Sequence, residues 1–481
     1  KEKLKELTKD TAIYGISTIV SRFLSFLLVP FYTNVFATGE YGIQSIVFNY
    51  IAFLNIIYIY GMDSSYLKFA SLREEGKEKD VFSTPYLSVL FSSVVISAVI
   101  LFFRNGVNSF MEIPPEYSVL AYYFTFILFF DALTVIPFAH LRIMRKAKKF
   151  AAIKTINIVI NVLLNIILLL KFKLGLEGVF ISNLAASFIT FLLLLPDILR
   201  NLKFRIEAGT LKNMLRFGIT YLPAGLASMV IQVIDRPILQ RLTNESVVGI
   251  YQANYKMGIF MMLFVSMFQY AWQPFFLNNA KEKDARQLFS RVLTYFTIAG
   301  SFILILLSLF IDNLVRLHVY HARTIMDEKY WSGLPIIPVI LLGYLFNGIY
   351  INFTAGIFIR EKTKYIPYIT GAGALVNIAV NYLLIPYYGM MGAALATLAS
   401  YLVMSAILFF VTQRFYKIEY EYSKIARIFT AVALTGALYY IFDVRAVLYK
   451  LGLALLFALL LYIFRVISRE ELGSIKRLVR R

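Results

Sequence analysis

Long apolar runs, separated by short polar connections, dominate the sequence. The runs lack the alternation of half-buried strands and are too long for strands, so they predict helices. A helix needs about 20 mostly apolar residues to cross a bilayer. Fourteen runs meet this requirement: 11–36, 42–70, 81–103, 118–141, 150–171, 176–197, 214–240, 246–277, 288–311, 333–359, 366–386, 389–412, 424–442 and 446–465. The pattern predicts an all-α, polytopic membrane protein with 14 transmembrane helices.

The basic residues predict how these helices are oriented. The chain holds 48 Lys and Arg against 28 Asp and Glu, a formal net charge of +20. Of the 48, 34 fall in the N-terminal segment, in every second connection after it and in the C-terminal tail, whereas nine fall in the other connections. Cytoplasmic connections carry an excess of Lys and Arg, so we expect both termini in the cytoplasm. The basic charge does not indicate nucleic-acid binding, because no basic stretch forms a folded soluble domain.

An internal repeat divides the chain. Residues of the first half recur 207 to 216 positions later, as in Pro30 and Pro237, Gly42 and Gly249, Asn161 and Asn377, Asn165 and Asn381, Gly175 and Gly389, and Gly178 and Gly392. Each copy holds six helices, an even number, so both copies enter the membrane from the same side. The repeat predicts two parallel six-helix lobes, 1–200 and 201–412. Residues 413–481 are expected to form two extra transmembrane helices and a basic cytoplasmic tail.

The composition excludes several kinds of chemistry. There is no cysteine, which excludes a disulfide, a thiolate metal site and a cysteine nucleophile, and there are only three histidines. No Gly-x-x-x-x-Gly-Lys-Ser/Thr loop is present to hold ATP phosphates. His318 and His321 are three residues apart, but without an evident third ligand we interpret them as solvated loop residues. We expect a transporter rather than an enzyme, with no catalytic residue, no metal and no cofactor.

Charged residues inside the apolar runs are the main candidates for a functional site. Arg22 and Lys256 each lie about ten residues into a run, which places them near the bilayer midplane at about 1.5 Å per residue. A charge at that depth costs about 2.5–3.5 kcal/mol on insertion scales, so each should face a wet cavity or a partner. Cations in a wet cavity favour an anionic ligand such as a diphosphate.

Polar neighbours on the same and nearby helices extend this candidate binding site. The predicted substrate-binding residues are Arg22, Lys256, Asp235, Arg236, Gln232, Gln252, Gln273 and Asn55. For the neutral residues, hydrogen bonds that hold helices together are the structural alternative. For Asp235 and Arg236, a structural ion pair or a gate is an equal alternative to a substrate contact.

A second set of residues is predicted to act in coupling or gating: Asp63, Lys68, Asp131, Lys154, Pro30 and Pro237. For Lys68 and Lys154, snorkelling of the side chain to the membrane interface is the alternative. Pro30 and Pro237 occupy equivalent places in the repeat, and each would bend its helix. Such bends suit a cavity that opens by rocking, and static kinks are the alternative.

Several motifs carry a resemblance to a known family. They are Leu7-Thr8-Lys9-Asp10-Thr11 with Arg22, Pro30-Phe31-Tyr32, Glu40-Tyr41-Gly42, Gly61-Met62-Asp63, Asn377-x-x-x-Asn381 through Pro386, and Gly389-x-x-Gly392-Ala393-Ala394. Through them, residues 1–412 resemble the polysaccharide flippases of the multidrug/oligosaccharidyl-lipid/polysaccharide exporter superfamily. The resemblance implies lobes arranged in a V, a central cavity and alternating access. Arg22 and Lys256 match cationic positions of that cavity.

The resemblance also implies a substrate and a setting. The substrate would be an undecaprenyl-diphosphate-linked oligosaccharide, moved from the cytoplasmic to the outer leaflet of the inner (cytoplasmic) membrane of a prokaryote. Expected partners are this lipid-linked glycan, membrane lipids, and the polymerase or glycosyltransferases of the same pathway, with no nucleic acid. The chain is expected to be a monomer, and a coupling ion or the membrane potential would drive transport.

Other functions remain as alternatives. A cation-coupled multidrug exporter of the same superfamily would favour a carboxylate-rich cavity, for which Asp131 is the lone candidate. A peptidoglycan-precursor flippase would agree with the two extra helices, which resemble those that flank a lipid-tail groove in such flippases. A membrane-embedded sugar transferase would need an acidic cluster and a larger surface outside the membrane.

Overall fold

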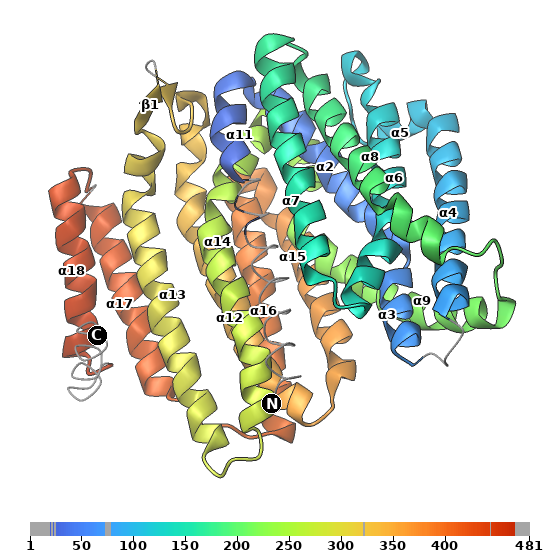
Figure 1. Cartoon of the computed structure of the whole chain (residues 1–481). Helices are drawn as coiled ribbons and strands as arrows, with labels where there is room; N and C mark the ends of the chain where they lie inside the picture. The colour runs from blue at the N-terminus through green and yellow to red at the C-terminus, as the bar shows by residue number, and fades with distance from the viewer. Residues whose placement is uncertain are drawn as a thin grey trace. The chain divides into compact units, whose positions relative to one another are not determined.

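The structure is a computed structural model that describes residues 26–72, 78–320, 323–442 and 444–466, with Val20 and Phe23. Its elements (Figure 1) are an apolar helix at Phe26–Val35, α2 (Thr38–Ile59), α3 (Met62–Ser71), α4 (Glu78–Phe102), α5 (Arg104–Phe110), η1 (Pro115–Tyr117), α6 (Leu120–Ile143), α7 (Ala147–Ile166), η2 (Ile167–Lys171), α8 (Gly175–Asn201), α9 (Ala208–Val233), α10 (Asp235–Leu242), α11 (Glu245–Tyr255), η3 (Lys256–Gly258), α12 (Ile259–Asn279), α13 (Ala285–Val315), β1 (His318–Tyr320), β2 (Arg323–Thr324), η4 (Glu328–Ile336), α14 (Ile337–Ile359), η5 (Thr363–Tyr365), α15 (Ile366–Tyr388), α16 (Met390–Phe415), α17 (Tyr422–Ile441) and α18 (Val447–Ile463).

Apolar helices make up nearly all of the described chain. Within it, 12 helices are long and apolar enough to cross a membrane, and Phe26–Val35 and Val447–Ile463 are two shorter apolar helices. The prediction of an all-helical, multi-pass membrane protein is confirmed. The one departure among the described residues is a short antiparallel ribbon of β1 and β2 in the connection that follows α13.

The run 42–70, predicted as one helix, is two helices. Tyr60 has φ 36° and Gly61 has φ 77°, so the backbone is left-handed at both residues and α2 ends there. The residue after them, Met62, begins α3. The prediction of one continuous helix was wrong because apolar character alone does not report a left-handed turn.

Two further predicted helices are also interrupted. The run 214–240 separates at Ile234 into α9 and α10, three residues before Pro237. A proline ring clashes with the carbonyl four residues earlier, so a helix is expected to break there. The run 246–277 contains a 3-10 turn, Lys256–Gly258, between α11 and α12. The prediction of one continuous helix was therefore wrong for both runs.

Contacts divide the described chain into two compact units. Unit 1 extends to Ala253 and includes Asn377–Ala393, and unit 2 comprises Asn254–Val376 and the chain from Ala394 onward. The predicted lobe boundary after residue 200 stays a prediction. In unit 1, α6 packs against α2, α3, α4, α7 and α8 and is the most buried candidate span. In unit 2, α14 packs against α12 and α13.

Two glycines that the repeat pairs bring α2 and α11 into backbone contact in unit 1. A Cβ atom at Gly42 would overlap the carbonyl oxygen of Glu245, and one at Gly249 would overlap that of Thr38. Each overlapping carbonyl belongs to the residue four places before the opposite glycine. The absence of a side chain at both positions therefore permits this approach.

Asparagines that the repeat pairs make the same hydrogen bonds. The Asn165 side chain donates to the backbone oxygen of Asn161 at 2.8 Å, and the Asn381 side chain donates to that of Asn377 at 2.8 Å. In both pairs the same amide also lies within hydrogen-bond distance of the partner's side-chain oxygen. The sequence repeat thus corresponds to a repeated local structure.

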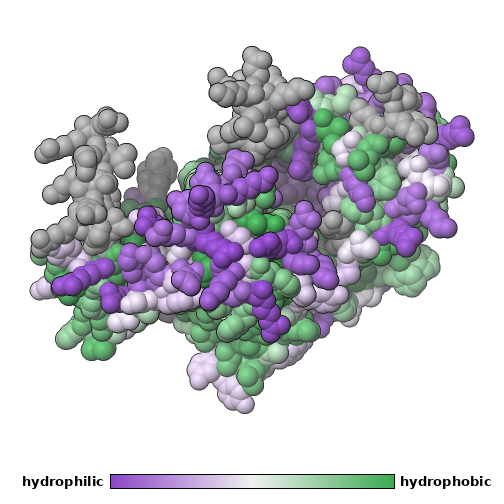
Figure 2. Space-filling model, turned by 90° about the horizontal axis from the view of Figure 1, so that it is seen from below, coloured by the Kyte–Doolittle hydropathy of each residue, from purple (hydrophilic) through white to green (hydrophobic). Residues whose placement is uncertain are grey.

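Hydrophilic residues gather on one face of the molecule. Figure 2 views the molecule from below relative to Figure 1, and hydrophilic residues concentrate on this face while hydrophobic residues lie toward its margins. A bundle that spans a bilayer needs apolar flanks and polar ends. The distribution of polar residues on this face therefore agrees with a bundle of membrane-spanning helices.

A buried cation attaches α18 to the rest of unit 2. Lys450 is 0% exposed, and its Nζ contacts the two carboxylate oxygens of Asp312 on α13 at 2.7 and 2.8 Å. The same nitrogen donates to the side-chain oxygen of Asn313 at 2.7 Å. An apolar cluster of α13, α17, α18 and the residue Val466 after α18 accompanies this bond: Ile305, Leu309, Ile428, Ala431, Phe457, Leu461 and Val466.

Replacing Gly249 with alanine should destabilise unit 1. The new methyl group would separate α11 from α2, and overpacking of this kind costs about 1–3 kcal/mol or more. Thermal unfolding of the purified protein in detergent would report a lower melting temperature for Gly249→Ala. The control is Gly436→Ala on α17, where nothing lies within 4 Å and alanine should be neutral or slightly stabilising. Equal melting temperatures for both variants would contradict the contact.

Replacing Lys450 with methionine should loosen α18. The change leaves Asp312 without its cation, and we expect a loss of about 2 kcal/mol, less than for a fully buried pair because Asp312 is 27% exposed. The measurement is limited proteolysis and thermal unfolding. The control is Lys417→Met, whose pair with Glu419 spans 4.0 Å and is 74% and 88% exposed, so no change is expected.

Candidate functional site

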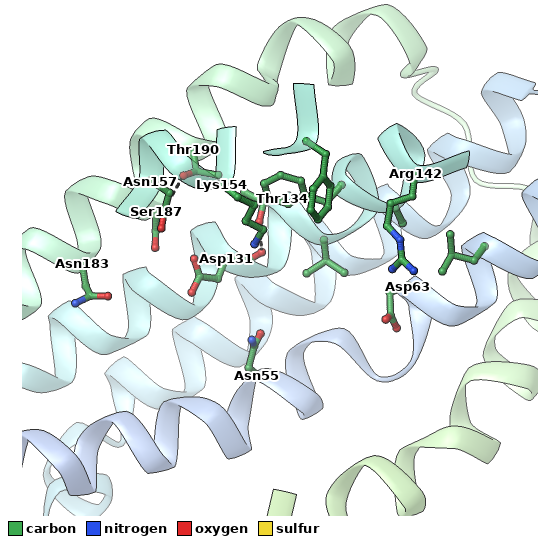
Figure 3. A pocket seen from close by; sticks show the side chains of 15 residues that line it. Asn55, Asp63, Asp131, Thr134, Arg142, Lys154, Asn157, Asn183, Ser187 and Thr190 are labelled. Atoms are coloured by element: carbon green, nitrogen blue, oxygen red, sulfur yellow. Dashed lines mark hydrogen bonds between the residues drawn. The ribbon is translucent and has the colours of Figure 1, made fainter. Parts of the chain in front are cut away.

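A polar cavity of about 400 Å³ lies inside unit 1 (Figure 3). Side chains of α2, α3, α6, α7 and α8 enclose it. Its polar lining residues are Asn55, Asp63, Asp131, Thr134, Arg142, Lys154, Asn157, Asn183, Ser187 and Thr190. Its other lining residues are Leu67, Val135, Phe138, Ala139 and Phe150. We call this space the polar cavity.

Helical spacing brings these side chains together. On α8, Asn183, Ser187 and Thr190 follow at intervals of four and three residues, so they share one face. On α6, Asp131 and Thr134 are three residues apart and share a face in the same way. Because α6 is the central helix of unit 1, its polar face is held between the other walls.

Charged side chains occupy two places along the cavity. Asp131 of α6 and Lys154 of α7 attract one another, and Figure 3 shows Ser187 of α8 beside Asp131. The Nζ of Lys154 lies 4.3 Å from the centroid of the Phe138 ring, which adds a cation–π contact. Figure 3 shows Asp63 of α3 and Arg142 of α6 pointing toward one another. Each carboxylate therefore faces a cation.

Neutral side chains supply further hydrogen-bonding groups. The Asn157 amide donates to the hydroxyl of Thr190 at 2.9 Å, which links α7 to α8. The Asn183 amide donates to the Val179 carbonyl of its own helix at 3.3 Å. The side-chain oxygen of Asn55 is buried and accepts no hydrogen bond from the described residues. The cavity thus holds amide groups whose hydrogen bonds are not all satisfied.

The structure brings four of the predicted residues into this one cavity. They are Asn55, predicted to bind substrate, and Asp63, Asp131 and Lys154, predicted to act in coupling or gating. The roles themselves stay predictions. Their proximity was not predicted, since they lie on four different helices.

Asp235 and Arg236 form a buried cluster instead. The Arg236 guanidinium contacts Asp235 at 2.6 Å, and the two side chains are 4% and 0% exposed. Arg236 also donates to the side-chain oxygen of Gln252 at 3.1 Å and to the backbone oxygen of Gln232 at 2.6 Å. The Tyr251 hydroxyl donates to the second oxygen of Asp235. This geometry favours the structural ion pair among the alternatives.

The remaining predicted binding residues are placed as follows. The side chains of Gln232, Lys256 and Gln273 are exposed, with Gln232 in unit 1 and the other two in unit 2. Lys256 lies in the 3-10 turn η3 rather than in a continuous helix. Arg22 lies outside the described residues.

The other residues predicted for gating have defined surroundings. Pro30 lies in the helix Phe26–Val35, where its carbonyl accepts hydrogen bonds from the side chains of Thr33 and Asn34. Pro237 lies in the first turn of α10, next to the break at Ile234. The Lys68 side chain is exposed, and its Nζ lies 4.0 Å from the centroid of the Phe217 ring, a contact typical of a snorkelling lysine.

Unit 2 contains a cavity of the opposite character. It measures about 350 Å³ and lies between α13, α14, α16 and α17. Most of its lining residues are aromatic or aliphatic: Leu293, Phe346, Ile349, Phe353, Leu402, Ala406, Phe409, Phe410, Tyr420, Tyr422, Ile425 and Phe429. We call it the apolar cavity, and its lining suits a hydrocarbon chain.

Comparison with known proteins adds a family to this geometry. Residues 7–280, more than half of the chain, match the family model described as polysaccharide biosynthesis protein. The chain belongs to this polysaccharide biosynthesis family. The resemblance noted in the sequence is thereby confirmed. A search of curated protein sequences found no significant match.

Solved structures similar to this family member include membrane transporters. The lipid II flippase MurJ, in an inward closed conformation, aligns with a TM-score of 0.75 at 16% identity over 98% of this chain and 100% of that one. An inward-facing multidrug resistance MATE transporter aligns with a TM-score of 0.66 at 14% identity, covering 82% and 94%. A Vibrio cholerae MATE transporter, VcmN, aligns with a TM-score of 0.59 at 13% identity, covering 86% and 98%. At these identities the likeness establishes the fold.

Sequence reasoning missed several residues of the polar cavity in this family member. They are Thr134, Arg142, Asn157, Asn183, Ser187 and Thr190. Most are neutral, and neutral residues in apolar runs are common. The available signal was spacing, because Asn183, Ser187 and Thr190 form a polar stripe on an otherwise apolar helix. Among the described residues, no group of three His, Asp or Glu could hold a metal ion.

A single cysteine can test whether the polar cavity contains water, because the natural chain has none. Asn183→Cys should react with a charged thiol reagent at least about tenfold faster than Ser182→Cys, since thiol reactivity follows exposure. Ser182, the adjacent residue on α8, is fully buried and bonds to its own helix at Gly178. Labelling is followed by mass spectrometry, with denatured protein as the reference for full reaction. Equally slow labelling of both cysteines would show that the cavity is dry.

Proposed function

We propose that the protein moves an undecaprenyl-diphosphate-linked oligosaccharide from the cytoplasmic to the outer leaflet of the cell membrane by alternating access. The observation that carries this proposal is the match of residues 7–280 to the polysaccharide biosynthesis family. A chain composed almost entirely of membrane helices in its described part has little surface for bond-forming chemistry outside the membrane. Moving a membrane-bound intermediate is the contribution to polysaccharide synthesis that such a chain suits.

Physical chemistry explains why a protein is needed for this step. A glycan carries many hydroxyl groups, and transfer of each unpaired hydroxyl to an apolar medium costs roughly 2–7 kcal/mol. The diphosphate adds charge, which is still more costly in the bilayer. A transporter lowers this barrier by offering polar groups to the headgroup and apolar surface to the lipid. The polar cavity and the apolar cavity match these two requirements.

The proposed direction agrees with the charge of the substrate. Moving one negative charge out of a negative interior gains about 2.3 kcal/mol per 100 mV. The membrane potential would then assist export of a diphosphate headgroup. Lys256, whose side chain is exposed in unit 2, and Arg22 remain the proposed contacts of the diphosphate.

Purified protein in vesicles can test this function. The probe is an undecaprenyl-diphosphate-linked oligosaccharide with a fluorescent tag on the glycan, quenched by a reagent that does not cross the membrane. We expect the protein to make inner-leaflet probe accessible, and Lys256→Glu to slow this at least about tenfold by repelling the diphosphate. The control is Lys364→Glu, an exposed lysine of η5, which should leave the rate unchanged. Lack of movement with folded wild-type protein would refute the proposal.

A multidrug exporter is the second candidate function. The observation that favours it is the presence of two carboxylates, Asp63 and Asp131, in one cavity of a chain with the MATE fold. The same vesicles distinguish the two functions. Dye movement driven by a sodium or proton gradient, with the lipid-linked glycan immobile, would support the exporter. Movement of lipid II in preference to other lipid-linked glycans would instead indicate a peptidoglycan-precursor flippase.

A further inference from the structure

We propose that the polar cavity of unit 1 binds a neutral sugar residue of the glycan headgroup. The inference rests on the proposed function and assigns one part of the substrate to one site. Its basis is the combination of charge balance, unused hydrogen-bonding groups, aromatic walls and volume in this cavity.

The charges of the cavity balance one another. Two carboxylates, Asp63 and Asp131, lie with two cations, Arg142 and Lys154, so the lining formed by the described residues has no net formal charge. Asp131 and Lys154 lie on neighbouring walls of the cavity, and their charges attract one another. A free anion would be attracted by each cation but repelled by the carboxylate that faces it. A free cation would be attracted by each carboxylate but repelled by the facing cation. A neutral ligand with hydroxyl groups avoids this penalty, because each hydroxyl can donate to a carboxylate and accept from a cation.

The neutral side chains of the cavity also offer hydrogen-bond donors and acceptors to a ligand. The Asn55 side-chain oxygen is buried, and within the described part of the chain it has no hydrogen-bond donor. Figure 3 shows this side chain pointing from α2 toward Asp131. An unsatisfied buried acceptor destabilises the protein, and a ligand hydroxyl that donates to it would recover part of that cost. Asn183 bonds only weakly to its own helix at 3.3 Å, so it can turn to a ligand.

Aromatic walls complete the site. The rings of Phe138 and Phe150 pack edge to face with centroids 5.1 Å apart, and both line the cavity. The face of a pyranose ring presents C–H groups, which pack on an aromatic surface while the hydroxyls at its edge meet the polar groups. A hydrated metal ion or a proton has no apolar surface that could pack on these rings.

The volume limits how much of the glycan can enter. About 400 Å³ lies at the low end of the roughly 300–1,000 Å³ typical of ligand sites. This space accommodates a single sugar residue or a disaccharide, whereas a longer oligosaccharide would extend beyond it. The site would therefore distinguish substrates by one sugar rather than by chain length.

The test compares an asparagine inside the cavity with one outside it. Asn183→Ala removes an amide from the cavity, whereas Asn279→Ala removes an amide on α12 that bonds to its own helix in the same way, to Phe275 at 2.8 Å. The first probe is the oligosaccharide released by mild acid from the lipid-linked intermediates of cells that make this protein. Its binding to purified protein is measured by saturation-transfer NMR and calorimetry. We expect Asn183→Ala to weaken binding about three- to tenfold, the effect of one hydrogen bond, and Asn279→Ala to have no effect.

Transport in vesicles gives the second measurement. Two probes are compared, the lipid-linked oligosaccharide and undecaprenyl diphosphate without sugar. We expect Asn183→Ala to slow the first probe and to leave the second unchanged. Equal slowing of both probes, or no binding of the free glycan to wild-type protein, would overturn the inference while the proposed function stands. Glycan binding at this site in a protein that moves neither probe would instead refute the proposed function alone. Tighter binding of a lipophilic cation than of the glycan would overturn the sugar assignment.

Discussion

The hydrocarbon of a bilayer offers no hydrogen bonds, and this constraint governs where every polar group of the chain can lie. A polar side chain at membrane depth must find a protein partner or a space that admits water. Arg236 follows the first course, with Asp235, Gln252 and the Gln232 carbonyl as its partners. Lys450 does the same with Asp312 and Asn313. The polar cavity follows the second course, since its amides and charges face an open volume.

This distinction separates structural charges from candidate functional ones. A fully paired charge makes all of its ion-pair and hydrogen-bond contacts within the protein, so it can bind a ligand only by breaking some of them. The cavity residues can still form hydrogen bonds to a ligand. The Asn55 oxygen is the plainest case, because it accepts none from the described residues. The central position of α6 explains why the cavity persists, because a helix packed against α2, α3, α4, α7 and α8 holds its polar face in place.

Much of the architecture could be predicted from the sequence, because about 20 apolar residues are a strong physical requirement and leave a long signal. The interruptions at Tyr60–Gly61, at Ile234 and at η3 could not, because they depend on local backbone geometry inside runs that stay apolar. The site was predicted in part. Asp63, Asp131 and Lys154 attract notice as charges within apolar runs, but their meeting in one cavity depends on the packing of α3, α6 and α7. The neutral members of the cavity carry too little signal one by one, and only the stripe on α8 distinguishes them.

The contact between α2 and α11 has a consequence for tracing ancestry. Backbone meets backbone at Gly42 and Gly249, so no larger residue can replace either without moving a helix. Apolar residues elsewhere in a membrane bundle can replace one another, so the sequences of related bundles can lose most of their identity. The two glycines at positions 42 and 249 should be substituted far more slowly during evolution. They offer a landmark for aligning distant homologues when the rest of their sequences no longer agree.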